Sequence, residues 1–175
     1  IMEDQSVECW GYDNYGQSSP PDFADIKQVS ANGNYTCAIL GDQNVECWGI
    51  NNFGQSTPPA TLKLVSQIST GINHACAVLG DQSVDCWGDQ TTAGTPPTNL
   101  SPVSQVVAGG YNTCVLLVDQ SVECWGNNSD GQSLVPPNLG NVKQLVAGMY
   151  RICALLVDQI LEKHSGIGSG LVFNM

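Results

Sequence analysis

The residues of this sequence best suited to covalent chemistry are its eight cysteines. Each of three pairs flanks an Asp-Gln sequence, which together with the neighbouring Gly or Asx residues is typical of a tight hairpin turn. Residues equidistant from such a turn face each other roughly 4.5–5.5 Å apart, within reach of a disulfide bond. The sequence therefore predicts three cross-strand disulfides, each between residues ten positions apart: Cys37 and Cys47, Cys76 and Cys86, and Cys114 and Cys124.

Cys9 and Cys153 are left over from this pairing. Cys9 has no upstream partner, and the sequence after Asp158 and Gln159 reads ILEKHS where the other repeats have a Cys-Trp-Gly strand. Three alternatives stay open for these two residues: free thiols, a bond to each other if the array curls round, or bonds to another chain. Because Ile1 lies in the middle of a repeat, we expect the natural N-terminus to lie further upstream.

Metal and catalytic chemistry find little support in the sequence. Zinc sites prefer cysteines two to four residues apart, a spacing that does not occur here. The two histidines are His74 and His164, and the positions that match His74 in other repeats hold Tyr35, Asn112 and Arg151. A catalytic base would not vary in this way, and we see no nucleophile–base pair and no phosphate-binding loop. We predict no enzyme activity, no metal and no cofactor.

The elements that position these residues are set by an internal repeat. The tripeptide Cys-Trp-Gly recurs at intervals of 38, 39 and 38 residues, and Asp-Gln, Pro-Pro and a second cysteine keep the same step. Helical cysteine-pair proteins of the mitochondrial intermembrane space share the cysteine spacing. However, Asp-Gln turn sequences inside each pair and Pro-Pro after it disfavour helices.

One repeat unit, residues 26–59, predicts short antiparallel strands. We expect strands at 26–31, 35–40 and 45–48, with a weak fourth strand around 55–57. A unit of about 38 residues cannot bury a core alone, so neighbouring units must stack. The predicted fold class is all-β, a partial or open β-propeller of four to five blades over residues 1–159, followed by a non-repeat tail at 160–175. A solenoid is the second alternative.

Composition limits the partners. Five Lys and Arg against 16 Asp and Glu give a net charge of −11, which excludes a nucleic-acid surface and disfavours acidic membranes. No apolar run approaches the length of a membrane span. Structural disulfides predict an extracellular or other oxidising, extracytoplasmic compartment, with an organelle lumen as the alternative. The triplets that begin at Asn34, Asn99 and Asn127 are candidate glycosylation sites.

The repeats resemble a known family. WGYDNYGQSSPP, WGINNFGQSTPP and WGNNSDGQSLVPP are similar to repeats of the regulator of chromosome condensation superfamily, and VSANGNYTCAIL, ISTGINHACAVL and VVAGGYNTCVLL fit the strand before each hairpin. The pairing of CAIL with VECWG is similar to the ectodomain repeats of the plant crinkly receptor kinases. The GQ-x-x-PP exit is similar to a secreted β-lactamase-inhibitor protein. The resemblance implies a propeller that binds partners and does not catalyse.

The strand order predicts where a partner binds. The turn before each second strand and the loop after each third strand lie at the same end of every blade, opposite the Asp-Gln turn. Aromatic and Arg side chains are common interface anchors. The predicted contact residues are Tyr12, Tyr15, Tyr35, Phe53, His74, Tyr111, Tyr150 and Arg151, with Met149 beside them.

Two functions from different classes follow. The first is a non-catalytic, extracytoplasmic protein-binding or scaffold module, serving as a subunit of a larger assembly. The alternative is a carbohydrate-binding module or glycan-processing enzyme, with the repeated tryptophans Trp10, Trp48, Trp87 and Trp125 stacking on sugars instead of packing between blades.

Overall fold

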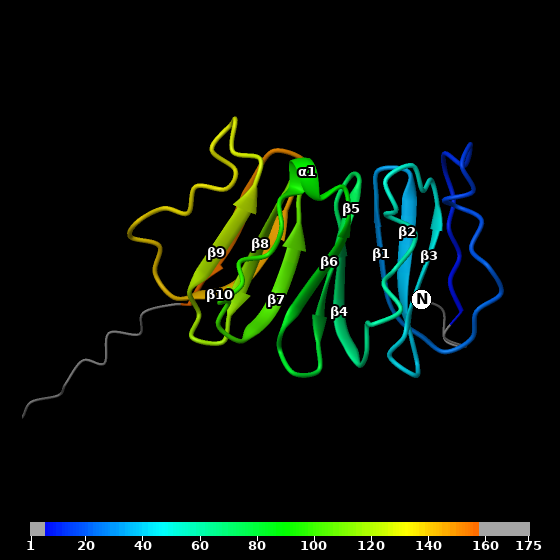
Figure 1. Cartoon of the computed structure of the whole chain (residues 1–175), viewed down its shortest axis with the longest axis horizontal. Coiled ribbons are helices and arrows are strands. Elements are labelled where there is room, and N and C mark those ends of the chain that lie inside the picture. The colour runs from blue at the N-terminus through cyan, green and yellow to red at the C-terminus, as the bar shows by residue number, and fades with distance from the viewer. Residues whose placement is uncertain (1–5, 158–175) are drawn as a thin grey trace, which may run out of the picture.

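The computed structural model describes residues 6–157, which form four antiparallel β-sheets standing side by side in a row (Figure 1). Three sheets have three strands each and the fourth has two. Each sheet is one blade, so these residues build an open, partial propeller. The strands are β1 (Ile26–Asn32), β2 (Tyr35–Leu40), β3 (Val45–Gly49), β4 (Val65–Thr70), β5 (His74–Leu79), β6 (Val84–Gly88), β7 (Val103–Ala108), β8 (Asn112–Leu117), β9 (Val122–Gly126), β10 (Val142–Ala147) and β11 (Ile152–Leu156).

The Asp-Gln sequences form the hairpin turns between second and third strands, as predicted. In the first blade, Asp42 Oδ1 accepts the N–H of Asn44 at 3.0 Å, and Gln43 takes a left-handed backbone with φ of 67°. Asp81 and Asp119 make the same turn in the next two blades, and hydrogen bonds from the following serines lower the pKa of both carboxyls. The aspartates therefore shape turns.

The glutamine of each turn joins one blade to the next. The main-chain carbonyl of Gln43 accepts the N–H of Val65, the first residue of the next blade's inner strand, at 3.1 Å. This contact explains why the Asp-Gln turn recurs once in every repeat. It recurs twice, from Val103 to Gln82 at 2.9 Å and from Val142 to Gln120 at 3.0 Å.

A second glutamine bridges the inner strands through its side chain. The Gln28 amide donates to the Ile68 carbonyl at 2.9 Å and accepts the Ile68 N–H at 3.0 Å. The glutamine side chain thus makes the two backbone hydrogen bonds that a neighbouring strand would make within one sheet. The bridge recurs between Gln67 and Val106 and between Gln105 and Leu145.

Most of the core lies between blades. One cluster joins Tyr35 and Ile39 of the first blade to Val65, Ile68 and Trp87 of the second. A single thin blade cannot bury enough apolar area to be stable on its own. The apolar area buried between neighbouring blades therefore supplies most of the stabilisation. The middle strands β2, β5 and β8 are accordingly buried along almost their whole length.

Two details differ from the predicted unit. Residues 55–57 lie in a turn and its exit, so each complete blade has three strands and the weak fourth strand was wrong. The loop after β6 contains a short helix, α1 (Gln90–Ala93), capped by Asp89, whose carboxylate accepts the Thr91 N–H. Among residues 6–157, no helix is long and apolar enough to span a membrane. The predicted boundary at residue 159 and the tail at 160–175 lie outside the described residues.

Candidate interaction surface

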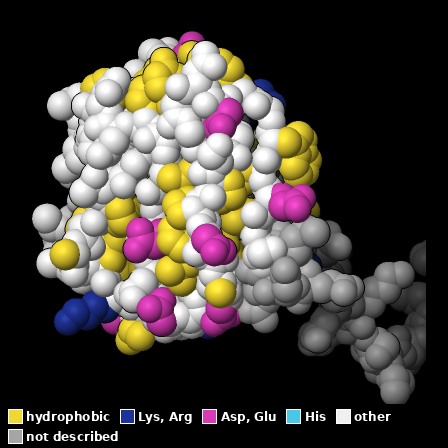
Figure 2. All heavy atoms as spheres, turned by 90° about the vertical axis from the view of Figure 1, so that its right-hand side faces the viewer, with side chains coloured by type: hydrophobic (Ala, Val, Ile, Leu, Met, Phe, Trp, Pro, Cys, Tyr) yellow, Lys and Arg dark blue, Asp and Glu magenta, His cyan; other side chains and the backbone are white. Residues whose placement is uncertain are grey.

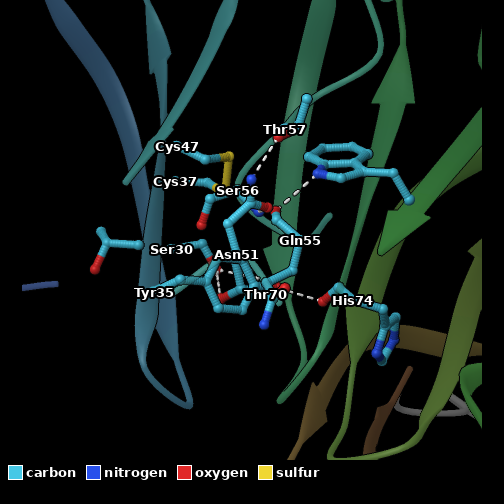
Figure 3. Close-up of a disulfide and its surroundings, with 12 residues drawn as sticks. Ser30, Tyr35, Cys37, Cys47, Asn51, Gln55, Ser56, Thr57, Thr70 and His74 are labelled. Atoms are coloured by element: carbon cyan, nitrogen blue, oxygen red, sulfur yellow. Dashed lines mark hydrogen bonds between the residues drawn. A yellow bond between two sulfur atoms is a disulfide. The ribbon is translucent and has the colours of Figure 1, made fainter. Parts of the chain in front are cut away.

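The three predicted disulfides are present. Cys37–Cys47, Cys76–Cys86 and Cys114–Cys124 each join directly opposite residues of a second and a third strand, with Cα atoms 4.0–4.1 Å apart. Figure 3 shows the first of them beside the contact between the first two blades. Cys9 is half-buried, Cys153 is exposed, and both are free thiols in this structure.

Two sets of loops gather at one end of the blades. The loops after β3, β6 and β9 and the turns between first and second strands lie at the top of Figure 1, whereas the Asp-Gln turns lie at the bottom. This arrangement follows from three antiparallel strands per blade, because the first and third strands of each blade run in the same direction. We call the upper end the loop face.

Side-chain hydrogen bonds brace the long loops of the loop face. In the loop after β3, Asn51 Oδ1 accepts the Ser56 N–H at 2.9 Å, and Gln55 Oε1 accepts the Phe53 N–H at 2.9 Å. These bonds hold the exposed ring of Phe53 on a fixed turn. The equivalent pairs are Asp13 with Ser18, Gln17 with Tyr15, Asn128 with Ser133, and Gln132 with Asp130.

The Gly-Gln dipeptide in these loops connects them to the core through hydrogen bonds to buried tryptophans. The carbonyl of Gln17 accepts the indole N–H of Trp48 at 3.0 Å. The carbonyl of Gln55, which is labelled in Figure 3, accepts the indole N–H of Trp87 at 2.9 Å. The sequence marks this dipeptide by its repetition, but the indole partner was missed. In the third loop the glutamine is replaced by Thr95, and the indole N–H of Trp125 has no partner among the described residues.

The four tryptophans divide into two groups. Trp48, Trp87 and Trp125 are 5–9% exposed and pack between blades. They are therefore closed to a sugar ring. Trp10 is 88% exposed.

Four predicted contact residues are exposed on braced loops or turns of the loop face. Tyr12, Tyr15 and Phe53 are each about half exposed, and the two tyrosine rings meet edge to face with centroids 6.3 Å apart. At the other end of the array, Tyr150 is 52% exposed.

Two predicted contact residues, Tyr35 and His74, are instead buried, each 1% exposed. The Tyr35 hydroxyl donates to the main-chain carbonyl of His74, and His74 Nε2 hydrogen-bonds Thr113 Oγ1 of the third blade at 3.0 Å. The next blade covers both side chains, so the prediction that they contact a partner is wrong.

Burial changes the ionisation of this pair. Desolvation lowers the pKa of the His74 imidazole to about 4, and the Asp89 carboxylate opposes this with a smaller effect. Burial also raises the pKa of the Tyr35 hydroxyl. Both side chains are therefore neutral at neutral pH and serve as packing groups.

Tyr111 and Arg151 lie at the turns between the first and second strands of the last two blades. Tyr111 is half-buried, and the N–H of the adjacent Gly110 donates to the Met149 carbonyl of the next blade at 3.0 Å. Arg151 matches His74 in the repeat but is exposed, since no further blade covers it among residues 6–157. The side chain at this repeat position is therefore exposed where no described blade packs against it, and buried where one does.

The candidate glycosylation asparagines differ in access. Asn99 is exposed, in the connection between blades two and three. Asn34 and Asn127 are half-buried; Thr36 of the first triplet is buried, and Asn127 Oδ1 accepts from Gln132 Nε2 at 2.7 Å. Asn99 is therefore the most exposed of the three candidate asparagines. Within the described part of the chain, no group of three or more His, Cys, Asp or Glu side chains is arranged to hold a metal.

Disulfide-pinned three-stranded blades with a face of braced loops define a propeller-repeat protein. The family model of the regulator of chromosome condensation (RCC1) repeat matches residues 26–55, 65–92 and 103–132, which together make up just over half of the chain. The chain belongs to the RCC1 repeat family.

Solved structures agree with this membership. The ectodomain of the receptor kinase CR4 from Physcomitrella patens superposes with a TM-score of 0.72 at 27% identity, over 90% of this chain and 46% of that one. The CRINKLY ectodomain of the receptor kinase ACR4 from Arabidopsis thaliana gives 0.68 at 27% identity, over 90% and 54%. Yeast RCC1 (Prp20) bound to Kap60 gives 0.71 at 14% identity, over 86% and 50%, and shares the fold.

The chain spans about half the length of each of these structures. No curated protein sequence matches it.

Proposed function

We propose that this chain is a non-catalytic protein-binding or scaffold module of an oxidising, extracytoplasmic compartment, and that the loop face makes the contact. The observation that carries the proposal is the set of exposed aromatic rings, Tyr12, Tyr15, Phe53 and Tyr150, on one end of a rigid array. Aromatic side chains add large contact area at low entropy cost when their loops are already ordered. Tyr111, Met149 and Arg151 extend this face.

The comparisons support the proposal without naming a partner. The two receptor kinase structures are ectodomains, and the yeast relative was solved bound to Kap60. The three disulfides favour an oxidising compartment, because cysteines in the cytosol are kept reduced as free thiols. The net charge of −11 favours a basic partner surface.

A capture experiment tests the loop face. The folded chain is immobilised and exposed to secreted proteins, and bound proteins are compared between the native chain, the Tyr15→Ala/Phe53→Ala variant and the Tyr111→Ala/Tyr150→Ala variant. The matched control is Val118→Ala, which changes a residue 54% exposed at the opposite end. A partner lost with either double variant and kept with the control supports the proposal, whereas a partner that survives both double variants refutes the loop face.

The carbohydrate alternative is tested in the same preparation. Only Trp10 among the four tryptophans offers an exposed ring for sugar stacking in the described residues. A glycan array and a panel of chromogenic glycosides give the measurement, and binding that Trp10→Ala abolishes would favour this alternative over protein binding.

A further inference from the structure

The turn between β1 and β2 contains the only Asn-Gly dipeptide of the sequence, Asn32-Gly33. An asparagine followed by glycine is prone to an intramolecular reaction, in which the main-chain nitrogen of the glycine attacks the side-chain amide carbon. Glycine favours this reaction because it has no Cβ to hinder the approach of its nitrogen. The dipeptide is therefore a candidate modification site that needs no enzyme.

The fold leaves this dipeptide accessible to solvent. Asn32 is the last residue of β1 and pairs with Tyr35, so Gly33 and Asn34 form the loop of the hairpin. Gly33 is exposed and Asn32 is half-buried, at the end of the blade that carries the loop face. Water, which is the second reactant, therefore reaches the turn.

The reacting groups are already in contact in the folded chain. The Gly33 N–H donates to Oδ1 of Asn32 at 2.8 Å, so the attacking nitrogen lies against the amide that it must attack. Nδ2 of the same amide donates to the main-chain carbonyl of Thr70 in the second blade at 3.1 Å. This second bond restricts rotation of the amide and keeps it beside Gly33. Holding two reacting groups together raises the rate of their reaction.

Packing against the second blade requires the glycine. Gly33 has a left-handed backbone with φ of 58°, and a Cβ at this position would lie 2.7 Å from the main-chain carbonyl oxygen of Ile72. Any other residue would be strained here and would clash with the backbone of the second blade. The first blade therefore cannot replace the residue that makes Asn32 reactive without disturbing its contact with the second.

The other described blades lack this arrangement. Gly71, Gly109 and Gly148 stand at the position of Asn32 in the next three repeats, so no side-chain amide is present there. The hydrogen bond from Asn32 to Thr70 is accordingly specific to the contact between the first and second blades. The reaction is confined to that contact.

We propose that Asn32 is a site of spontaneous deamidation in the folded chain. The Gly33 nitrogen gives its proton to solvent and forms a bond to Cγ of Asn32. The bond between Cγ and Nδ2 breaks, and Nδ2 takes up a proton and leaves as ammonia. Water then opens the cyclic imide at either carbonyl, which gives a normal aspartyl residue or an isoaspartyl residue whose main chain runs through the former side chain. One water is consumed and one ammonia is released, with no oxidant or reductant.

Both products weaken the contact between the two blades. A carboxylate has no N–H, so the donor to the Thr70 carbonyl is lost and two acceptor oxygens face each other. The isoaspartyl product also lengthens the main chain between β1 and β2. This change lies close to the buried Tyr35, whose hydroxyl donates to the His74 carbonyl (Figure 3).

The new carboxylate also adds to an existing excess of negative charge. The net charge of the chain is −11, and Figure 2 shows that acidic side chains predominate over basic ones on the face at the first-blade end of the molecule. Self-repulsion among like charges destabilises a compact fold. Charge and hydrogen bonding therefore act in the same direction.

Peptide mapping of the aged chain tests the reaction. The folded chain, with its disulfides intact, is incubated in mildly alkaline buffer and digested, and mass spectrometry detects the mass gain that replaces an amide by a carboxyl. The comparison residue is Asn99, which is exposed and followed by leucine. We expect deamidation at Asn32 to be at least about tenfold faster than at Asn99, because the leucine side chain hinders attack by its own nitrogen. Similar rates at the two positions, or a fast reaction at Asn32 only after unfolding in urea, would overturn the proposal.

Urea denaturation of aged chains tests the consequence. Full conversion of the native chain should lower its folding equilibrium constant about fivefold, the usual effect of losing one hydrogen bond. Asn32→Gln keeps an amide but reacts far more slowly, because its cyclic imide would need a larger ring, so its stability should stay constant over the same period. Asn99→Asp adds an equal charge at an exposed position and should unfold like the fresh native chain. If the aged native chain unfolds at the same urea concentration as the fresh one, or if Asn99→Asp loses as much, the modification does not act on the contact between the blades.

Discussion

The hydroxyl of Tyr35 donates a hydrogen bond to the main-chain carbonyl of His74, across the boundary between the first and second blades. His74 in turn reaches Thr113 of the third blade through its ring nitrogen. One buried line of polar contacts therefore crosses three blades, beneath the loops of the loop face. This line holds adjacent blades in register, which apolar packing alone would leave free to slide.

Tyr35→Phe should weaken the contact between the first two blades. The variant keeps the ring and loses one buried hydrogen bond, while the His74 carbonyl keeps its bond from the Gly71 N–H. We expect a loss of about 1 kcal/mol in the free energy of unfolding, measured by urea denaturation. Tyr150→Phe removes an exposed hydroxyl and should change nothing measurable, so equal losses in both variants would contradict the assignment.

Acid should destabilise the fold through His74. Burial holds its pKa near 4 in the folded chain, below an unfolded value near 6.5, so the unfolded chain binds a proton first as the pH falls. This contribution to stability is complete above pH 6.5 and is lost progressively down to about pH 4, amounting to up to about 3 kcal/mol.

The comparison with His74→Asn isolates this effect from the carboxylates. Asn112 occupies the matching position in the third blade, so asparagine is compatible with the fold there. Urea midpoints measured between pH 7 and pH 4 should fall more steeply for the native chain than for the variant. Parallel curves would mean that His74 titrates normally.

Removing one cross-strand disulfide should destabilise without changing the fold. The Cys76→Ala/Cys86→Ala variant frees a loop closed by residues ten positions apart, and chain entropy alone predicts a loss of about 3 kcal/mol. Thermal unfolding gives the measurement. Cys9→Ala, measured in the same buffer without reducing agent, is the control. It removes a thiol that forms no disulfide in this structure and should have a much smaller effect.

The sequence predicts the blade well because the information is local. The ten-residue cysteine spacing and the Asp-Gln turn together fix the register of β2 against β3, and the structure has that register, with Cys37 opposite Cys47. The three strands that the first unit has were predicted to within one residue at each end. Local turn chemistry and alternation determine these features.

The contacts between blades could not be predicted in the same way. Tyr35 and His74 follow a turn, and their local sequence is that of an exposed loop; the next blade buries them. The double hydrogen bond of Gln28 with Ile68 joins residues 40 positions apart. Such contacts depend on how far each blade is rotated against its neighbour, which no single repeat encodes.

The glutamine bridge gives a last prediction with an internal control. Gln105→Ala removes two side-chain hydrogen bonds to Leu145 and leaves the Leu145 N–H and carbonyl without that partner between the third and fourth blades. We expect a loss of about 1–3 kcal/mol in unfolding free energy, because unsatisfied backbone groups near a core are costly. Gln144→Ala changes the same repeat position where the side chain is exposed, so it should cost less than about 0.5 kcal/mol in the same measurement. If the two variants unfold at the same urea concentration, the side-chain bridge does not hold the blades together.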